Sequence, residues 1–383
     1  MDVAVIIPLF NGSQWIRQTL ESVFSQSQPP REVVVVDDGS QDESLDIVKS
    51  FPGVMLLRNP DKGSHCARNF GLQHTTAPLV AFLDQDDIWH RDHLHLLSTI
   101  LNEFTECPAA VANCSSFYQE SKLVFPSPAL KPRSFHPWEA FPVNSIFTPS
   151  SVVMRRSALN LINGWPTRFT GIGVDYYTWL RLGVNQSLIR NSRVTVGYRQ
   201  HNNSQGMMLR LQNTQSLIDT HITILEDALS YRLSVCPEDA LLLKNRLDSL
   251  TNMSNIIKGA ITFNQSLLVN SAITFEERLA DESIYFIGSM CDLLLWLLDP
   301  YLDPQEAVLS TLLEYWPSKA DKTRKCFRER IAWSKKLPQH LLAHPFDLRW
   351  WALLAEFANI INKKAFLVEF ANMISQTMLK KST

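Results

Sequence analysis

The chain has 383 residues, 45% of them hydrophobic, and domains of ~100–200 residues would divide it into two or three. Its 36 basic and 38 acidic residues give a formal net charge of −2, which excludes the strongly basic footprint of a general nucleic-acid binder. The longest apolar stretch, residues 284–298, contains an aspartate and is shorter than the ~20 residues that span a bilayer.

The cysteines and the first residues favour a cytoplasmic setting. The six cysteines lie far apart, without a CxxC pair or zinc-finger spacing, so we expect reduced and mostly buried thiols. No basic residue precedes the first apolar run, and Pro8 interrupts that run. We therefore expect neither a signal peptide nor a membrane anchor there.

The first half of the chain alternates between strand and helix patterns. Short β-branched runs at residues 3–7, 33–36, 54–57 and 79–83 alternate with segments of helical period. One such segment places Ile16, Leu20, Val23 and Phe24 on one helix face. The pattern predicts βαβ units and a parallel sheet covered on both faces, with ligands at the carboxyl ends of the strands.

The loops after the first two runs lack the glycine patterns that bind phosphates. Phe10-Asn11-Gly12 fits neither GxGxxG nor GxxxxGK[ST], which excludes dehydrogenases and P-loop NTPases of the usual kind. A nucleotide bound here would need another source of positive charge, most simply a divalent cation. The second run leads into Asp37-Asp38-Gly39-Ser40, where Ser40 with Glu43 is equally typical of a helix capping box.

The fourth run leads into Asp84-Gln85-Asp86-Asp87. Three carboxylates within four residues repel one another unless a cation offsets their charge. Mg²⁺ or Mn²⁺, completed by water and substrate phosphates, suits such oxygen ligands. The turn therefore predicts a divalent-metal site, against the plainer interpretation of a solvated acidic turn.

Four segments together resemble the family 2 glycosyltransferases, inverting enzymes with the nucleotide-diphospho-sugar transferase (GT-A) fold. They are VIIPLFNG at 5–12, VVDDGS at 35–40, ARNFG at 67–71 and FLDQDD at 82–87. The resemblance covers about the first 200 residues and is greatest to bacterial O-antigen and rhamnosyl-type transferases. It implies an α/β fold, a doubly wound mixed sheet, followed here by an all-α C-terminal domain.

The resemblance also implies where the donor and the metal bind. Asp86 of the DXD-type motif is the implied principal metal ligand, and Asp84 lies near the ribose. Asp38 would accept the ring N–H of a pyrimidine base, as in a UDP- or dTDP-sugar. The donor-binding residues implied in this way are Pro8, Phe10, Asn11, Asp38, Arg68, Asn69, Asp84, Gln85 and Arg199, with Asp87 in support.

Inverting transfer needs a base that takes the proton from the acceptor hydroxyl. The family places this base in a Glu-Asp pair that opens a helix ending in Leu-Arg-Leu. Here Val174 replaces the first acid, Asp175 matches the second, and residues 180–182 are Leu-Arg-Leu. Asp175 is thus the implied catalytic base, although by local sequence alone it is also typical of a helix N-cap.

Residues 197–204, GYRQHNNS, resemble the YRxH segment that closes the catalytic domain in many bacterial members. His201 is the implied additional metal ligand, and Arg199 the partner of the diphosphate, in keeping with their charge. A lone histidine near a domain edge is otherwise typical of a protein surface.

The second half of the chain is predicted to be helical. Residues 1–204 contain 10 of 13 glycines and 14 of 20 prolines, and amphipathic patterns follow around 211–229, 241–261, 283–298, 307–316 and 349–379. We predict a catalytic domain at 1–205 and a helical domain at 206–383 for packing, oligomerisation or acceptor contact. Residues 319–336 hold eight basic residues against two acidic ones, typical of a solvated face or of peripheral contact with an anionic membrane.

These features predict a metal-dependent inverting glycosyltransferase of surface polysaccharide biosynthesis. Its partners would be a nucleoside-diphosphate sugar and a saccharide or lipid-linked saccharide acceptor, with no nucleic acid. One alternative is a catalytically silent nucleotide-sugar-binding or assembly subunit, which Val174 keeps open. A sugar-phosphate nucleotidyltransferase is less favoured, because the loop at Phe10–Ser13 is not glycine-rich and basic.

Overall fold

The computed structural model of the chain describes residues 2–117, 123, 125, 131–169, 173–201, 214–262, 264–279 and 290. The chain divides into two compact units, Met1–Leu247 and Asp248–Thr383. The described elements, in chain order, are β1 (Val3–Leu9), α1 (Ile16–Phe24), β2 (Glu32–Asp37), α2 (Ser44–Lys49), β3 (Val54–Arg58), α3 (Ser64–Gln73), β4 (Leu79–Phe82), β5 (Ile88–Trp89), α4 (His93–Glu103), β6 (Ala109–Phe117), β7 (Arg133–Phe135), β8 (Val152–Arg155), α5 (Arg156–Leu161), α6 (Val174–Leu182), β9 (Leu188–Arg199), α8 (Thr214–Val235), α9 (Ala240–Ile261) and α10 (Gln265–Arg278), with 3-10 turns at Pro137–Ala140, Pro149–Ser151 and Pro237–Asp239.

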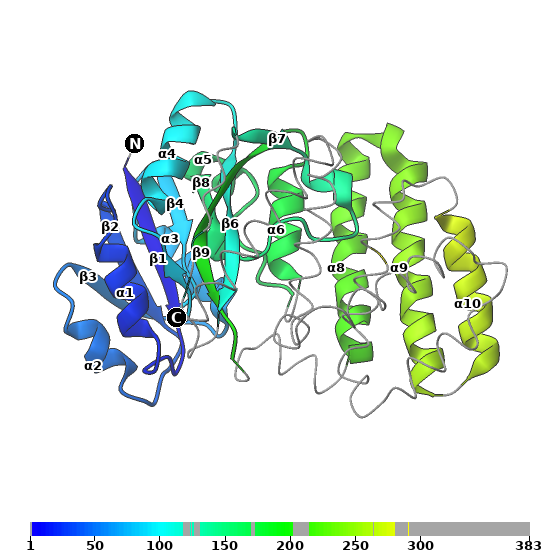
Figure 1. Cartoon of the computed structure of the whole chain (residues 1–383), viewed down its shortest axis with the longest axis horizontal. Helices are drawn as coiled ribbons and strands as arrows, with labels where there is room; N and C mark the ends of the chain where they lie inside the picture. The colour runs from blue at the N-terminus through cyan, green and yellow to red at the C-terminus, as the bar shows by residue number, and fades with distance from the viewer. Residues whose placement is uncertain are drawn as a thin grey trace, which may run out of the picture. The chain divides into compact units, whose positions relative to one another are not determined.

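The first unit is built on a mixed sheet, ordered β3-β2-β1-β4-β8-β6-β9-β5, with β7 paired to β9 (Figure 1). Strands β1 to β4 run parallel, and β8 lies antiparallel between β4 and β6. The four strands expected from the sequence are confirmed, as is the mixed α/β sheet. Because β1, β2 and β4 are parallel, the loops that carry Phe10, Asp38 and Asp84 leave from one edge of the sheet.

Helices cover both faces of the parallel strands. The odd-numbered residues of β1 belong to a core shared with α1 and α4. On the opposite face α3 packs so closely that a Cβ on Gly71 would lie 2.5 Å from Cγ2 of Ile6, so only glycine fits there. Of the four residues of helical period in α1, Ile16, Leu20 and Val23 are buried, whereas Phe24 is 44% exposed and stacks on Phe51 at a centroid distance of 5.9 Å.

Helices α8 and α9 confirm the first two helical patterns of the second half, whereas α10 was not expected. Helix α8 packs on α6 within the first unit (Figure 1), and this compact unit ends at Leu247, beyond the predicted boundary of the catalytic domain at 205. The other helical patterns, the basic stretch at 319–336, Cys291 and Cys326 lie outside the described residues. The four described cysteines are free thiols, and no helix in the described part of the chain is long and apolar enough to cross a bilayer.

Candidate active site

The acidic turn after β4 is held by partners from distant parts of the chain. A guanidinium nitrogen of Arg68, in α3, lies 2.5 Å from Oδ1 of Asp84. Nε2 of His201, just beyond β9, lies 2.8 Å from Oδ2 of Asp86. The side chains of Asp84 and Asp86 are 27% and 22% exposed. The turn is therefore a structured site, and the two implied metal ligands, Asp86 and His201, are in contact.

Asp87 anchors this turn to the sheet. Its carboxylate is 1% exposed and accepts hydrogen bonds from the Ser150 hydroxyl at 2.6 Å and the Arg199 N–H at 3.1 Å. Burial, together with the charges of Asp86 and Asp84, raises the pKa of Asp87 well above its usual range. Asp87 therefore positions the turn by joining it to β9 and to the 3-10 turn at Pro149–Ser151.

The donor set suits a divalent cation that a substrate completes. Mg²⁺ in nucleotide sites is usually held by one or two carboxylates, with phosphates and water in the remaining positions. Asp86 and His201 provide two donor groups side by side, and Nδ1 of His201 is buried without a hydrogen-bond partner. Within the described ranges no group of three or more His, Cys, Asp or Glu side chains could hold a metal by itself. The residues fit a cation that shares its coordination with a diphosphate.

Gln85 fixes the loop after β1. Its side-chain amide accepts from the N–H of Phe10 at 2.7 Å and donates to the carbonyl of Phe10 at 3.0 Å. A Cβ on Gly12 would lie 2.6 Å from Oε1 of Gln85, so glycine is required for this contact. The Phe10 ring is 52% exposed, whereas Pro8 is buried within β1. Of the two, Phe10 is the residue that presents a face to solvent.

Asn11 joins the first loop to the second. Its N–H donates to Oγ of Ser40 at 3.0 Å, and its side-chain carbonyl accepts from the N–H of Gln41 at 2.8 Å. The capping box suggested for Ser40 and Glu43 does not form, because α2 begins only at Ser44 and makes no side-chain cap. The hydroxyl of Ser40 is used instead to tie the two strand-end loops together.

Asp38 is oriented by the start of α3. Its carboxylate accepts from the Gly63 N–H, at 2.9 Å to the nearer oxygen, and from Nδ2 of Asn59 at 2.8 Å. Lys62 donates to the Asp38 carbonyl at 2.9 Å. Since carboxylate oxygens can each accept more than one hydrogen bond, Asp38 keeps capacity for a ligand N–H.

Arg68 and Asn69 are both engaged by Trp165, a residue that the sequence analysis did not single out. Arg68 is 5% exposed, and its guanidinium lies 4.9 Å from the centroid of the Trp165 ring. The side chain of Asn69 bonds the backbone N–H and carbonyl of Trp165, each at 2.8 Å. A direct contact between Asn69 and a nucleotide would break one of these bonds. The available sequence signal was the turn-forming pair Asn163-Gly164 before a tryptophan.

Arg199 is enclosed by the protein. It is 3% exposed, and its guanidinium lies 4.5 Å from the centroids of both Trp15 and Phe117. Its Nε donates to the carbonyl of Asp86 at 2.8 Å, and another nitrogen donates to Gln18. A contact with a diphosphate would require this enclosure to open, so in this structure Arg199 positions Asp86 through its backbone.

Asp175 lies in the first turn of α6, after Gly173, which has a φ of 99°. It accepts from the N–H of Tyr176 at 2.8 Å. Burial raises the pKa of Asp175 to about 6, against the lowering effect of that N–H and of the Arg68 charge. Val174, which replaces the family's first acid, is 1% exposed and belongs to the core.

Tyr198, in β9, is affected by the charges of both Asp175 and the acidic turn. Burial raises the pKa of its phenol well above the usual value. The negative charges that raise it further come from Asp87, Asp86, Asp84 and Asp175. The carboxylates of the turn and of α6 therefore all belong to the electrostatic surroundings of one phenol. Tyr198 belongs to the YRxH-like segment but received no role from the sequence.

The family comparison agrees with this geometry. Residues 4–162 match the family described as glycosyl transferase family 2. The chain carries a family 2 glycosyltransferase domain. It is 33% identical over 118 residues to the uncharacterized glycosyltransferase YibD of Escherichia coli K12, covering 30% of this chain and 33% of YibD. It is also 36% identical over 97 residues to the putative teichuronic acid biosynthesis glycosyltransferase TuaG of Bacillus subtilis, covering 24% of this chain and 38% of TuaG.

Structural comparison supports the same fold over more of the chain. A crystal structure of S. aureus TarS, residues 1–349, in complex with UDP-GlcNAc aligns with a TM-score of 0.53 at 16% identity. The alignment covers 87% of this chain and 92% of that one. At this identity the likeness shows the fold, which is the expected GT-A fold with a helical C-terminal region. The sequence matches cover only about a third of the length of curated relatives such as YibD and TuaG.

Proposed function

We propose that the chain is an inverting glycosyltransferase that moves a sugar from a UDP- or dTDP-sugar to a hydroxyl of a saccharide or lipid-linked saccharide. The proposal rests on one observation: after β4, Asp84 pairs with Arg68 and Asp86 with His201, and the charges of Arg68 and Asp84 act on Asp175. The UDP-GlcNAc bound to TarS supports a nucleotide-sugar donor, and the name of TuaG supports a surface-polysaccharide setting. A cytoplasmic location is part of the same proposal.

Asp175 is the proposed base. A pKa of about 6 leaves its carboxylate mostly deprotonated at pH 7, yet more basic than an ordinary aspartate. It takes the proton from the acceptor hydroxyl as the oxygen attacks the anomeric carbon opposite the leaving diphosphate. Since this is a single displacement, it inverts the anomeric configuration and needs no nucleophile from the protein.

The donor is held by the loops of the sheet edge. The exposed ring of Phe10 offers a stacking face to the pyrimidine of the donor nucleotide. Asp38 accepts a hydrogen bond from the ring N–H of that pyrimidine. Asp86 and His201 would hold Mn²⁺ or Mg²⁺, which supplies Lewis acidity toward the departing diphosphate when bound. The ion pair of Arg68 and Asp84 lines the donor site on one side. The ring of Trp165 packs against the guanidinium of Arg68 and so keeps this pair in position.

A thermal-shift experiment tests the donor site. UDP or dTDP with Mn²⁺ should raise the melting temperature of the wild type, since a ligand at 100 times its Kd adds about 2.7 kcal/mol of stability. Asp86→Ala should lose this shift. The matched control is Asp46→Ala, which should keep the shift, because this carboxylate is 83% exposed on α2 and pairs with Lys49.

The outcomes separate the alternatives. Metal-dependent stabilisation by UDP without sugar transfer to any hydroxyl acceptor would favour a silent nucleotide-sugar-binding subunit. If no nucleoside diphosphate stabilises the wild type, the proposed donor site is wrong. A shift that survives in Asp86→Ala would show that the metal ligand has been misassigned.

A further inference from the structure

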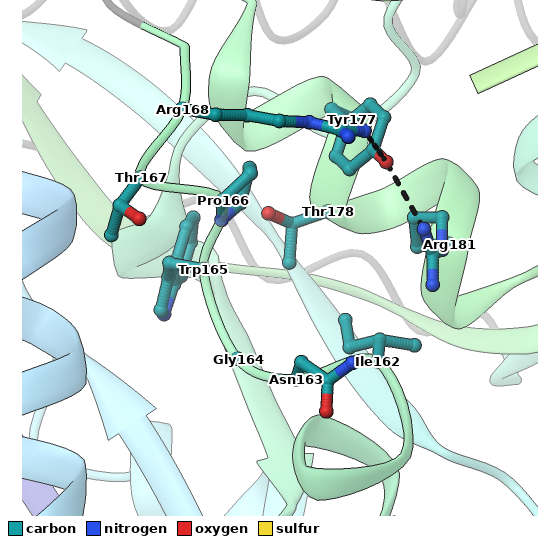
Figure 2. A pocket seen from close by; sticks show the side chains of 10 residues that line it. All are labelled: Ile162, Asn163, Gly164, Trp165, Pro166, Thr167, Arg168, Tyr177, Thr178 and Arg181. Carbon is teal, nitrogen blue, oxygen red and sulfur yellow. Dashed lines mark hydrogen bonds between the residues drawn. The ribbon is translucent and has the colours of Figure 1, made fainter. Parts of the chain in front are cut away.

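A pocket of about 270 Å³ lies beside α6, and of its lining residues only Trp165 also contacts residues assigned to the donor site. Its walls are the segment at residues 162–168 and the α6 residues Tyr177, Thr178 and Arg181 (Figure 2). Figure 2 shows Arg168 beside Tyr177 at one end and Thr178 facing Pro166 across the pocket. The pocket is of a size for a phosphate group or one charged sugar.

The lining of this pocket carries two cations and no anion. Arg168 pairs with Asp227 of α8, and the Tyr177 hydroxyl bonds both, at 2.9 Å to Arg168 and 2.8 Å to Asp227. Arg181 donates to the same hydroxyl at 3.0 Å, and its guanidinium lies 3.6 Å from the ring centroid of Tyr231.

Arg181 has no carboxylate partner among the described residues, and its Nε is buried without an acceptor. The carboxylate of Asp227 pairs with Arg168, and Arg181 is linked to it through the Tyr177 hydroxyl. A partly buried cation with an unused N–H donor is costly unless a ligand supplies the missing charge and acceptor.

Two structural links join the pocket to the catalytic residues. Asp175 and Arg181 lie on the same helix, and six residues of α-helix place them about 9 Å apart along its axis. Trp165 belongs to both sites, since it lines the pocket and holds the guanidinium of Arg68 against its ring. The pocket therefore lies within about two helical turns of Asp175, a separation that a single acceptor molecule can span.

We propose that this pocket binds an anionic group of the acceptor, a phosphate or a carboxylate, with Arg181 as its main contact. The proposal rests on the proposed function for the identity of the molecule that carries the anion. The guanidinium fork of arginine matches the geometry of these oxyanions better than a point charge does. The amide of Asn163 lies in the same lining and can donate a further hydrogen bond, whereas the Thr178 hydroxyl already donates to the carbonyl of Val174 at 3.2 Å and can only accept.

Calorimetric titration of the full chain with glycerol phosphate tests the pocket, with glycerol as the uncharged comparison. Glycerol phosphate should bind the wild type, whereas glycerol should not. Arg181→Gln should bind glycerol phosphate at least tenfold more weakly. The control is Arg91→Gln. The Arg91 side chain is 71% exposed and does not line the pocket, so this variant should bind glycerol phosphate as the wild type does. Arg181→Lys keeps the positive charge but lacks the two-pronged guanidinium, so it should bind glycerol phosphate several-fold more weakly than the wild type. This variant replaces Arg181→Gln in the test if Arg181→Gln does not fold.

Several results would overturn the proposal. These are no binding of glycerol phosphate to the wild type, equal binding by glycerol, or equal affinity in Arg181→Gln and Arg91→Gln. Loss of binding in Asp86→Ala, with Arg181→Gln unaffected, would place the anion at the donor diphosphate site instead. No donor is present in this titration, so its result is separate from the UDP test of the proposed function.

Discussion

At the scale of single residues, Asp175 carries the most specific claim. Val174 occupies the position of the family's first acid, so Asp175 works without a carboxylate neighbour in the helix. Asp175→Asn preserves the shape of the side chain and removes the base. We expect it to lower the rate of sugar transfer by at least about 100-fold, because positioned bases contribute ~10²–10⁴-fold.

The same variant should keep the UDP-induced rise in melting temperature of the wild type, since Asp175 is not assigned to the donor. Transfer is measured as acceptor-dependent release of the nucleoside diphosphate. A wild-type rate in Asp175→Asn would show that another group takes the proton.

The pH dependence of Asp175 has a definite sign. A base works when deprotonated, so the wild-type rate should fall as the pH drops through about 6. The folded-state pKa lies above the ordinary 3.8, so Asp175 contributes stability that is fully present below about pH 4 and is lost as the pH rises through 6. The melting temperature of Asp175→Asn, relative to the wild type, should therefore be higher at pH 8 than at pH 4.5. An unchanged difference would show that the carboxyl is not desolvated.

At the scale of elements, the strands were easier to predict than the loops that complete the site. A run of β-branched residues such as 33–36 is a local signal, and so is an acidic turn at the end of a strand. Trp165, Ser150 and Tyr198 carry no such signal, because each depends on a residue distant in the sequence: Trp165 on Asn69, and Ser150 and Tyr198 on Asp87. The YRxH-like segment and its positive charge predicted that Arg199 meets the diphosphate, whereas two aromatic rings enclose its guanidinium.

The loop at Asn163-Gly164-Trp165 offers a test at this scale. Gly164 has a φ of +70°, and a Cβ there would lie 2.5 Å from Oδ1 of Asn69. Gly164→Ala should therefore suffer backbone strain and also disturb both hydrogen bonds between Asn69 and Trp165. Gly53→Ala is the matched control, because Gly53 has a φ of +88° with nothing within 4 Å of its Cβ position.

Both alanine variants should lose about 1–2 kcal/mol of unfolding free energy to the left-handed backbone. Gly164→Ala should lose roughly 1–3 kcal/mol more, because the side-chain amide of Asn69 is left without its partners. Urea denaturation of the two variants measures the difference. Equal losses would mean that the contact between Asn69 and Trp165 contributes nothing to stability.

At the scale of the whole molecule, composition located the change from a turn-rich to a helical chain but not the edge of the compact unit. Glycine and proline become sparse after residue 204, which is a local property of the sequence. It predicted a helical segment there, and α8 begins at Thr214. Whether α8 packs on α6 or on later helices depends on complementary surfaces, which periodicity does not reveal. Asp227 and Tyr231 of α8 contact Arg168, Tyr177 and Arg181, and this shows that α8 packs with α6 in the first unit.

Truncation tests this assignment. Helix α8 buries Ile218, Ile222, Leu225 and Leu229, and each large apolar side chain contributes about 1.5–3 kcal/mol when fully buried. A chain ending at residue 247 should therefore unfold cooperatively. A chain ending at residue 205 should melt several degrees lower or aggregate, because the face of α6 that α8 covers becomes exposed. Calorimetric melting of the two truncated chains measures this difference. Equal melting temperatures would show that the catalytic domain is complete at residue 205 and that α8 is an independent addition.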